Sequence, residues 1–127
     1  MASWDEVARI AATLPEIEAR GREWRVRGKL VAWERPLRKS DITALGGDAP
    51  SGDILAIWLP SLDVKDALLA ADPAVYFTTP HFDGYRAVLV RLEEARADEI
   101  EELMIEGWVD RVPRSMSGPF LEARGLA

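Results

Sequence analysis

The sequence predicts an α+β protein: a two-layer α/β sandwich in which helices cover one face of a mainly antiparallel, five-stranded sheet. Three observations support this prediction. Apolar residues recur at helical spacing near both ends of the chain and once in its middle. Between these stretches lie short runs of β-branched, aromatic and aliphatic residues, several joined by short turns that favour antiparallel pairing. The 127 residues, 48% of them hydrophobic, suffice for a single domain, 1–127, with its own core.

Three stretches have the pattern of amphipathic helices. At 3–14 a Ser-x-x-Glu capping-box pattern opens the helix, and Pro15 disfavours its continuation. Asp63 is the expected cap of a second helix that runs to residue 71. The third helix is expected over 98–111, and one more helical turn is possible over 119–124.

The strands are expected where β-branched and aromatic residues alternate or run together. They are 23–27, 30–33, 53–59, 75–79 and 87–92. Gly28-Lys29 is the expected turn between the first two, and Asp83-Gly84 has the composition of a hairpin turn between the last two. The resulting element order is α-β-β-β-α-β-β-α. The long segment 35–52 is expected to form an ordered flap with one short helical turn and a mobile tip.

Composition excludes several classes of function. The chain has no cysteine, so disulfides, thiolate metal sites and cysteine nucleophiles are excluded. No apolar stretch is long enough to span a membrane, and the N-terminal residues do not resemble a signal peptide, so a cytoplasmic location is expected. The net charge is −6, but residues 20–39 hold eight bases and two acids, a segment charge of +6 that leaves −12 for the remainder. A solvated strand face balanced by acidic helices is the favoured interpretation of this distribution, and a functional basic patch is the alternative.

Several short pieces, spread over most of the chain, resemble the MmcQ/YjbR-like family. In chain order they are Val26-Arg27-Gly28-Lys29, Pro80-His81, Gly84-Tyr85, Val88-Leu89-Val90-Arg91-Leu92, Trp108 and Pro113. The resemblance implies a small two-layer α/β domain, similar in fold to type III secretion chaperones, and a proposed role in DNA binding. The segment 35–52 departs from the compact members of that family.

If the chain binds DNA, the basic strand hairpin should make the contact. Arg25 and Arg27 are expected on its wet face, with Lys29 beside them and Arg86 contributed from the neighbouring strand. The overall acidity and the absence of asparagine and glutamine, which read adenine edges, oppose this reading. Because the predicted fold resembles a chaperone, the first alternative is a module that binds another protein, a peptide or a second copy of itself.

The second alternative is a small-ligand pocket near His81, Tyr85 and Lys29. His81 is the only histidine, and it has no nucleophile, second histidine or cysteine at motif spacing. A structural role in the corner between the last two strands is therefore expected, with no catalytic residue, no enzymatic activity, no metal site and no cofactor. The five tryptophans are expected mainly in the core, although one on a strand could serve as a stacking platform.

Overall fold

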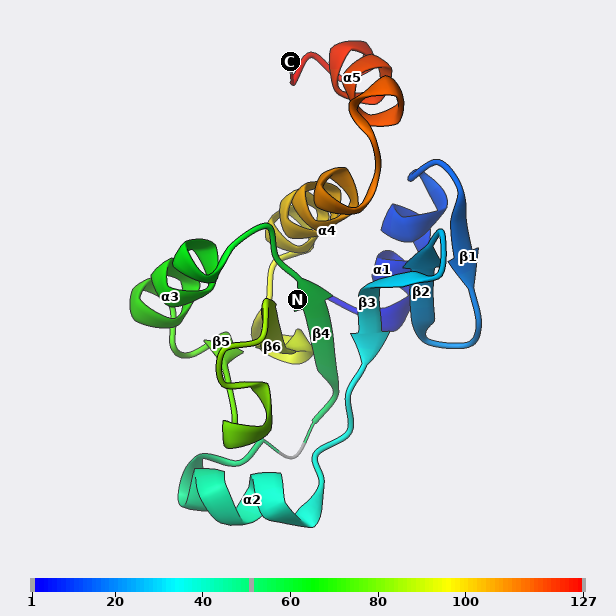
Figure 1. Cartoon of the computed structure of the whole chain (residues 1–127). Coiled ribbons are helices and arrows are strands. Elements are labelled where there is room, and N and C mark those ends of the chain that lie inside the picture. Colours follow the sequence, from blue (N-terminus) through cyan, green and yellow to red (C-terminus); the bar gives the residue numbers. More distant parts are fainter. Residues whose placement is uncertain (1, 51, 127) are drawn as a thin grey trace.

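The computed structural model describes residues 2–50 and 52–126, and over this part of the chain it contains five α-helices and six strands (Figure 1). The α-helices are α1 (Trp4–Ala12), α2 (Lys39–Leu45), α3 (Leu62–Ala71), α4 (Ala97–Arg111) and α5 (Arg114–Ala123). The strands are β1 (Ile17–Ala19), β2 (Glu23–Val26), β3 (Lys29–Glu34), β4 (Ile54–Trp58), β5 (Tyr76–Phe77) and β6 (Ala87–Arg91). Short 3-10 turns lie at Gly46–Asp48, Pro80–Phe82 and Leu92–Glu94.

All neighbouring strands are antiparallel, in the order β1-β2-β3-β4-β6-β5. The predicted α+β class is confirmed, but the sheet has six strands rather than five. The additional strand is β1, only three residues long, which pairs with β2 at the edge. So short a segment, between Pro15 and Gly21, has too few residues to show an alternating pattern.

One face of the sheet carries the main core. The α1 and α4 helices contact each other, and α4 also contacts β3 and β4. Trp108 of α4 is fully buried, and its indole N–H donates to the carbonyl of Pro15 at 3.0 Å. Leu89 of β6, on the other side of the sheet, is 1% exposed, so both residues are buried as expected. Gly107 allows the approach of α4 to the sheet, because a Cβ there would lie 2.4 Å from the carbonyl oxygen of Trp58.

The opposite face of the sheet, called here the open face, has only a small buried cluster of its own. Its buried members are Ile54, Ala56, Phe77, Phe82, Ala87 and Leu89. In the part of the chain that the structure describes, no long helix covers it, and the residues after β3 supply Leu37 and, from α2, Leu45 at one end (Figure 1). The expectation that helices lie on one face therefore holds for α1 and α4, whereas the two-turn α2 borders the other face.

Three local expectations are corrected. The β2–β3 turn is Arg27-Gly28, where φ is 52° and 80°, the two positive values of a type I′ hairpin turn. Lys29 is therefore the first residue of β3. The α3 helix is capped by Ser61, two residues before the predicted cap Asp63, and the Ser61 side chain accepts the Val64 amide.

The last helix is longer than expected, because α5 runs through Pro119. Phe120 packs its ring on Trp108, with 4.8 Å between ring centroids, and this tertiary contact outweighs the backbone hydrogen bond that a proline removes. Among the described residues, no helix has the length and apolar character needed to cross a membrane.

Candidate functional site

The open face is hollowed beside β3, where the corner between β5 and β6 rises over the sheet. The hollow has a volume of about 580 Å³. It is lined by Trp33, Glu34, Arg35, Pro36, Leu37, Arg38, His81, Phe82 and Tyr85. Trp33 comes from the end of β3, and the three rings of residues 81–85 come from the corner. The hollow is therefore an aromatic site bordered by arginines.

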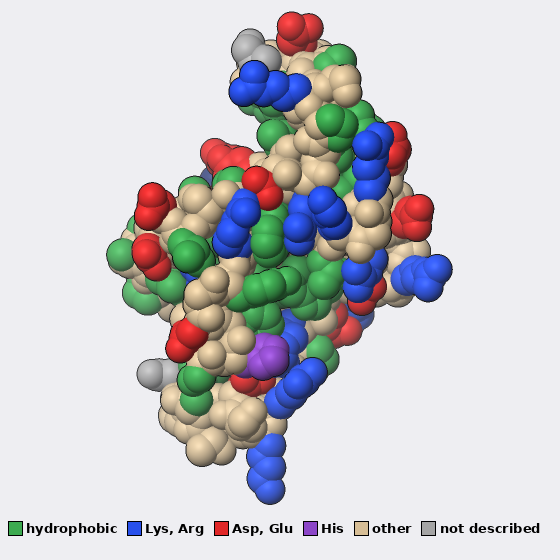
Figure 2. Space-filling view, in the orientation of Figure 1, with side chains coloured by type: hydrophobic (Ala, Val, Ile, Leu, Met, Phe, Trp, Pro, Cys, Tyr) green, Lys and Arg blue, Asp and Glu red, His purple; other side chains and the backbone are tan. Residues whose placement is uncertain are grey.

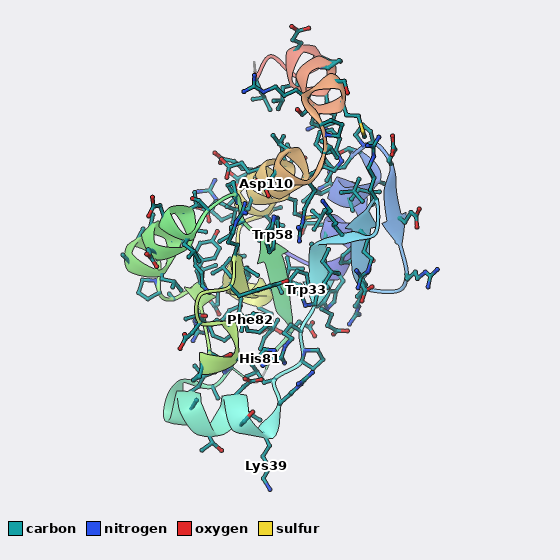
Figure 3. All side chains as sticks on the ribbon, viewed as in Figure 1. Trp33, Lys39, Trp58, His81, Phe82 and Asp110 are labelled. Atoms are coloured by element: carbon teal, nitrogen blue, oxygen red, sulfur yellow. The ribbon has the colours of Figure 1, made fainter. Side chains whose placement is uncertain are left out.

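The aromatic rings form a continuous row along this face. His81 meets Phe82 edge-on at 5.0 Å between centroids, Phe82 lies 5.9 Å from Tyr85, and Tyr85 meets Trp58 edge-on at 5.5 Å. Phe82 is buried, whereas Tyr85 is 40% exposed and Trp33 is half-buried. Figure 3 shows Trp58, Trp33, Phe82 and His81 following one another along this side of the molecule. Exposed rings therefore rest on buried rings, an arrangement that keeps the exposed ones fixed.

A buried lysine holds the corner in place. Lys65 of α3 is 3% exposed, and its ammonium donates to the carbonyls of Phe82 at 2.7 Å and Tyr85 at 2.8 Å. Burial lowers the pKa of Lys65, and the charges of Asp83 and Asp66 oppose this shift. The helical pattern placed α3's inner face at Val64, Ala67, Leu68 and Ala71, so sequence reasoning missed Lys65. A lysine one position away from an apolar stripe is the only signal that could have suggested it.

Two arginines cover Trp58 at the other end of the row. The guanidinium carbon of Arg111 lies 3.5 Å from the ring centroid of Trp58, and that of Arg86 lies 4.8 Å away. Asp110 accepts from the Trp58 indole N–H at 2.8 Å and pairs with Arg86 at 2.9 Å. Arg111 also donates to the carbonyl of Leu30 in β3. The end of α4 thus brings a positive charge onto the open face, a role that the sequence did not reveal.

The segment 35–52 is anchored by a buried ion pair below the hollow. Arg35 and Asp41 are 8% and 3% exposed and lie 3.1 Å apart. Burial alone would raise the pKa of Asp41, but the Arg38 amide and the charge of Arg35 outweigh it, so that this pKa lies below its ordinary value. Arg35 also lies over the Phe82 ring at 5.2 Å. The pair therefore ties α2 to the aromatic corner.

The four residues predicted for DNA contact do not form one uniform patch. Arg25 pairs with Glu23 at 2.6 Å and donates to the Gly28 carbonyl, and Arg86 pairs with Asp110. Arg27 projects from the turn and pairs with Glu16, 3.2 Å away. Lys29 is exposed, with no ion pair among the residues that the structure describes. Arg25 and Arg86 belong to the open face, whereas Arg27 lies at the sheet edge toward β1.

The predicted ligand residues are only partly brought together. His81 and Tyr85 line the same hollow, but Lys29 does not. The His81 side chain is exposed, and the corner is held by Lys65 rather than by the imidazole. Within the described ranges, no group of three or more histidine, aspartate or glutamate side chains is placed to hold a metal ion.

Charge is unevenly distributed around the molecule. Figure 2 shows hydrophobic side chains gathered in the middle of the open face, with Lys and Arg around them and His81 at one side. The acidic residues of α4, among them Glu101, Glu102 and Glu106, lie away from this face, against α3 and α5. The face that displays the aromatic rings is therefore the basic side of an acidic protein.

Three similar proteins match nearly the whole chain. They are Uncharacterized protein Rv2570 of Mycobacterium tuberculosis (strain ATCC 25618 / H37Rv), Uncharacterized protein MT2646 of Mycobacterium tuberculosis (strain CDC 1551 / Oshkosh) and Uncharacterized protein Mb2600 of Mycobacterium bovis. Each is 51% identical to it over 129 residues, which span 98% of this chain and 100% of the relative. The chain belongs to the family of these mycobacterial proteins. No family model matches it, and no solved structure matches it significantly. The relatives' names state no activity, and a function has to be inferred from the geometry and chemistry of the site.

Proposed function

We propose that this protein binds DNA in single-stranded form, with bases stacked on the aromatic rings of the open face. The observation that carries the proposal is the placement of Trp33 and Tyr85, two partly exposed rings that line one hollow bordered by arginines. Stacking of bases on aromatic side chains, with basic groups along the backbone path, is how proteins bind single strands without reading their sequence. Trp33 and Tyr85 would take bases, and Arg38 and Arg111 would take phosphates.

A single strand fits this face better than a duplex. Sequence reading in a duplex needs a helix or a ribbon that enters the major groove, and it favours asparagine or glutamine, which this sequence lacks. A sheet face with exposed rings instead suits splayed bases. The basic hairpin, predicted to make the contact, would lie at the side of the strand path through Arg25.

Binding is expected to be weak. Arg25 and Arg86 already pair with carboxylates, and the net charge of −6 opposes the approach of a polyanion. We therefore expect a Kd of ~1 µM or weaker at physiological salt and a shallow salt dependence, with a log–log slope of about −0.7 for each phosphate neutralised.

Fluorescence anisotropy with a labelled oligothymidylate of about ten nucleotides tests the proposal at low salt. Trp33→Ala should weaken binding about tenfold, because stacking contributes ~1–3 kcal/mol per base. Reversing Arg25 and Arg27 to Glu should weaken binding, because Arg25 borders the path of the strand, while leaving the fold intact. The matched control reverses Arg9 and Arg96, two arginines exposed by 66% and 72% of their side chains, which changes the net charge equally.

Two results would contradict the proposal. One is no binding of either single strand or duplex at tens of micromolar protein. The other is an equal loss in the two charge-reversed variants, because that would assign any binding to net charge alone.

A small-ligand function is the second candidate, since the hollow of about 580 Å³ has the volume of a ligand site. A free mononucleotide that quenches tryptophan fluorescence in the wild type and not in Trp33→Ala would favour it.

A cytoplasmic, non-enzymatic role and membership of the MmcQ/YjbR-like family belong to the proposal of DNA binding.

A further inference from the structure

A second surface lies away from the open face, where α5 stands off from α4 at the C-terminal end of the fold (Figure 1). Between these helices is a groove of about 800 Å³. Its apolar lining comprises Pro60, Ile105, Val109, Leu121 and Leu126, and its charged lining comprises Asp98, Glu101, Glu102, Glu106, Asp110 and Arg124. Leu126 is 59% exposed, the largest exposure among the large hydrophobic side chains in the described part of the chain. The groove thus has an apolar floor and an acidic rim.

The acidic rim is a regular row along α4. Asp98, Glu102, Glu106 and Asp110 follow one another at intervals of four residues, so their side chains are neighbours on one face of the helix. The two ends of this row are neutralised, because Asp98 pairs with Arg96 at 3.0 Å and Asp110 with Arg86 at 2.9 Å.

The two glutamates in the middle of the row are not neutralised. Glu102 and Glu106 have no ion pair among the residues that the structure describes. Like charges four residues apart destabilise a helix, so the two neighbouring glutamates repel each other. Partial burial, and secondarily the charge of Glu102, raise the pKa of Glu106. A cation placed against the middle of α4 would relieve this repulsion.

A smaller groove continues the surface toward α3. It has a volume of about 430 Å³, shares Glu102 and Glu106 with the first groove, and has Val64, Leu68 and Leu103 in its lining. The two glutamates therefore form a ridge with apolar surface on both sides. Along α4, a helix of 15 residues, this surface is about 22 Å long, the length of four helical turns.

We propose that this surface is the docking site for a basic amphipathic helix of a partner protein. The apolar side of that helix would lie on Ile105, Val109 and Leu121, as in other complexes in which a helix lies in a groove. Its lysines or arginines, at intervals of four residues, would lie along Glu102 and Glu106, and this complementarity of charge selects a basic partner over an acidic one.

A second copy of this chain is a poor occupant. Its basic segment, residues 20–39, is folded almost entirely into β2, β3 and their connections and has no free basic helix. The helix that begins there, α2, has only seven residues. The partner must therefore be a different protein.

The test uses a fluorescently labelled peptide of about four helical turns, made of leucine and lysine so that one face is apolar and the other basic. The full chain should bind it at physiological salt, and a peptide with glutamate in place of lysine should not bind. The double reversal of Glu102 and Glu106 to Lys should weaken binding about tenfold or more, because like charges then face each other. Leu126→Ser should weaken binding without affecting the fold, because the side chain is exposed.

The matched control reverses Glu93 and Glu94 to Lys, two exposed acids outside the groove, and gives the same net charge. Equal binding by the two double variants would overturn the proposal, because attraction would then depend on net charge alone. The proposal would also be overturned if the chain bound both the basic and the acidic peptide. The same holds if it bound neither peptide when the protein is in 100-fold excess over the labelled peptide. So would a concentration-dependent dimer of the chain that the Glu102 and Glu106 reversal dissolves, since a second copy would then occupy the groove.

Discussion

Lys65→Met tests how the aromatic corner is held on the sheet. Methionine keeps the length and apolar stem of the side chain but removes the ammonium that donates to the carbonyls of Phe82 and Tyr85. The Phe82 carbonyl then keeps only the Tyr85 amide, 3.0 Å away, and the Tyr85 carbonyl loses its lysine donor. The variant should be less stable, and the rings that line the hollow should become mobile.

The size of the effect follows from two opposing contributions. Each hydrogen bond to a charged group contributes ~1.5–3 kcal/mol, and burial of the ammonium, visible in the lowered pKa of Lys65, offsets part of the sum. We therefore expect a loss of ~2–4 kcal/mol in the free energy of unfolding. For a domain of this size the melting temperature should fall by roughly 8–15 °C.

Urea unfolding followed by tryptophan fluorescence measures the loss. The control is Lys39→Met, the same change at an exposed lysine of α2 that points away from the protein (Figure 3). Equal midpoints for the two variants would refute the anchoring role of Lys65. A second readout is the pH dependence of stability. In the folded protein the pKa of Lys65 lies below its ordinary value of 10.5, so at pH values between the folded and unfolded pKa the unfolded chain binds more protons. The stability of the wild type relative to Lys65→Met should therefore rise with pH across that window.

Three further changes, with Gly118→Ala as the control for the first, probe the framework. Gly107→Ala should cost ~1–3 kcal/mol, because its Cβ would lie 2.4 Å from the Trp58 carbonyl oxygen; Gly118→Ala, with nothing within 4 Å, should be neutral or stabilising in the same denaturation assay. Asp41→Asn should cost ~3–5 kcal/mol by leaving a buried arginine unpaired. The wild type should lose stability as pH falls through the lowered pKa of Asp41, and the variant should not. Trp108→Ala should cost ~3–5 kcal/mol, whereas a melting shift of a degree would refute its core position.

Periodicity and turn chemistry predicted most of the framework, because local sequence determines these features. The stripes of α1 and α4 and the apolar run of β4 needed no tertiary information. The prediction was wrong where tertiary contacts decide: β1 exists through its pairing with β2, and α5 passes Pro119 because Phe120 packs on Trp108.

The site was harder to predict, because its geometry depends on pairs far apart in the sequence. Tyr85 and His81 were expected to lie together, and they do line one hollow. The pairing of Arg86 with Asp110, the position of Arg111 over Trp58 and the burial of Lys65 all join elements that no motif spacing connects. Sequence reasoning also counted the arginines of the hairpin as available charge, whereas Arg25 and Arg27 pair with carboxylates.

The proposed binding of nucleic acid on the open face can be followed through the indole N–H resonances of the five tryptophans. Titration with an unlabelled oligothymidylate should shift the signals of Trp33, in the hollow, and Trp58, bonded to Asp110. The signal of Trp108, buried between the sheet and α5, should stay in place. Unchanged Trp33 and Trp58 signals at saturating oligonucleotide, or a shift of the Trp108 signal alone, would contradict binding on the open face.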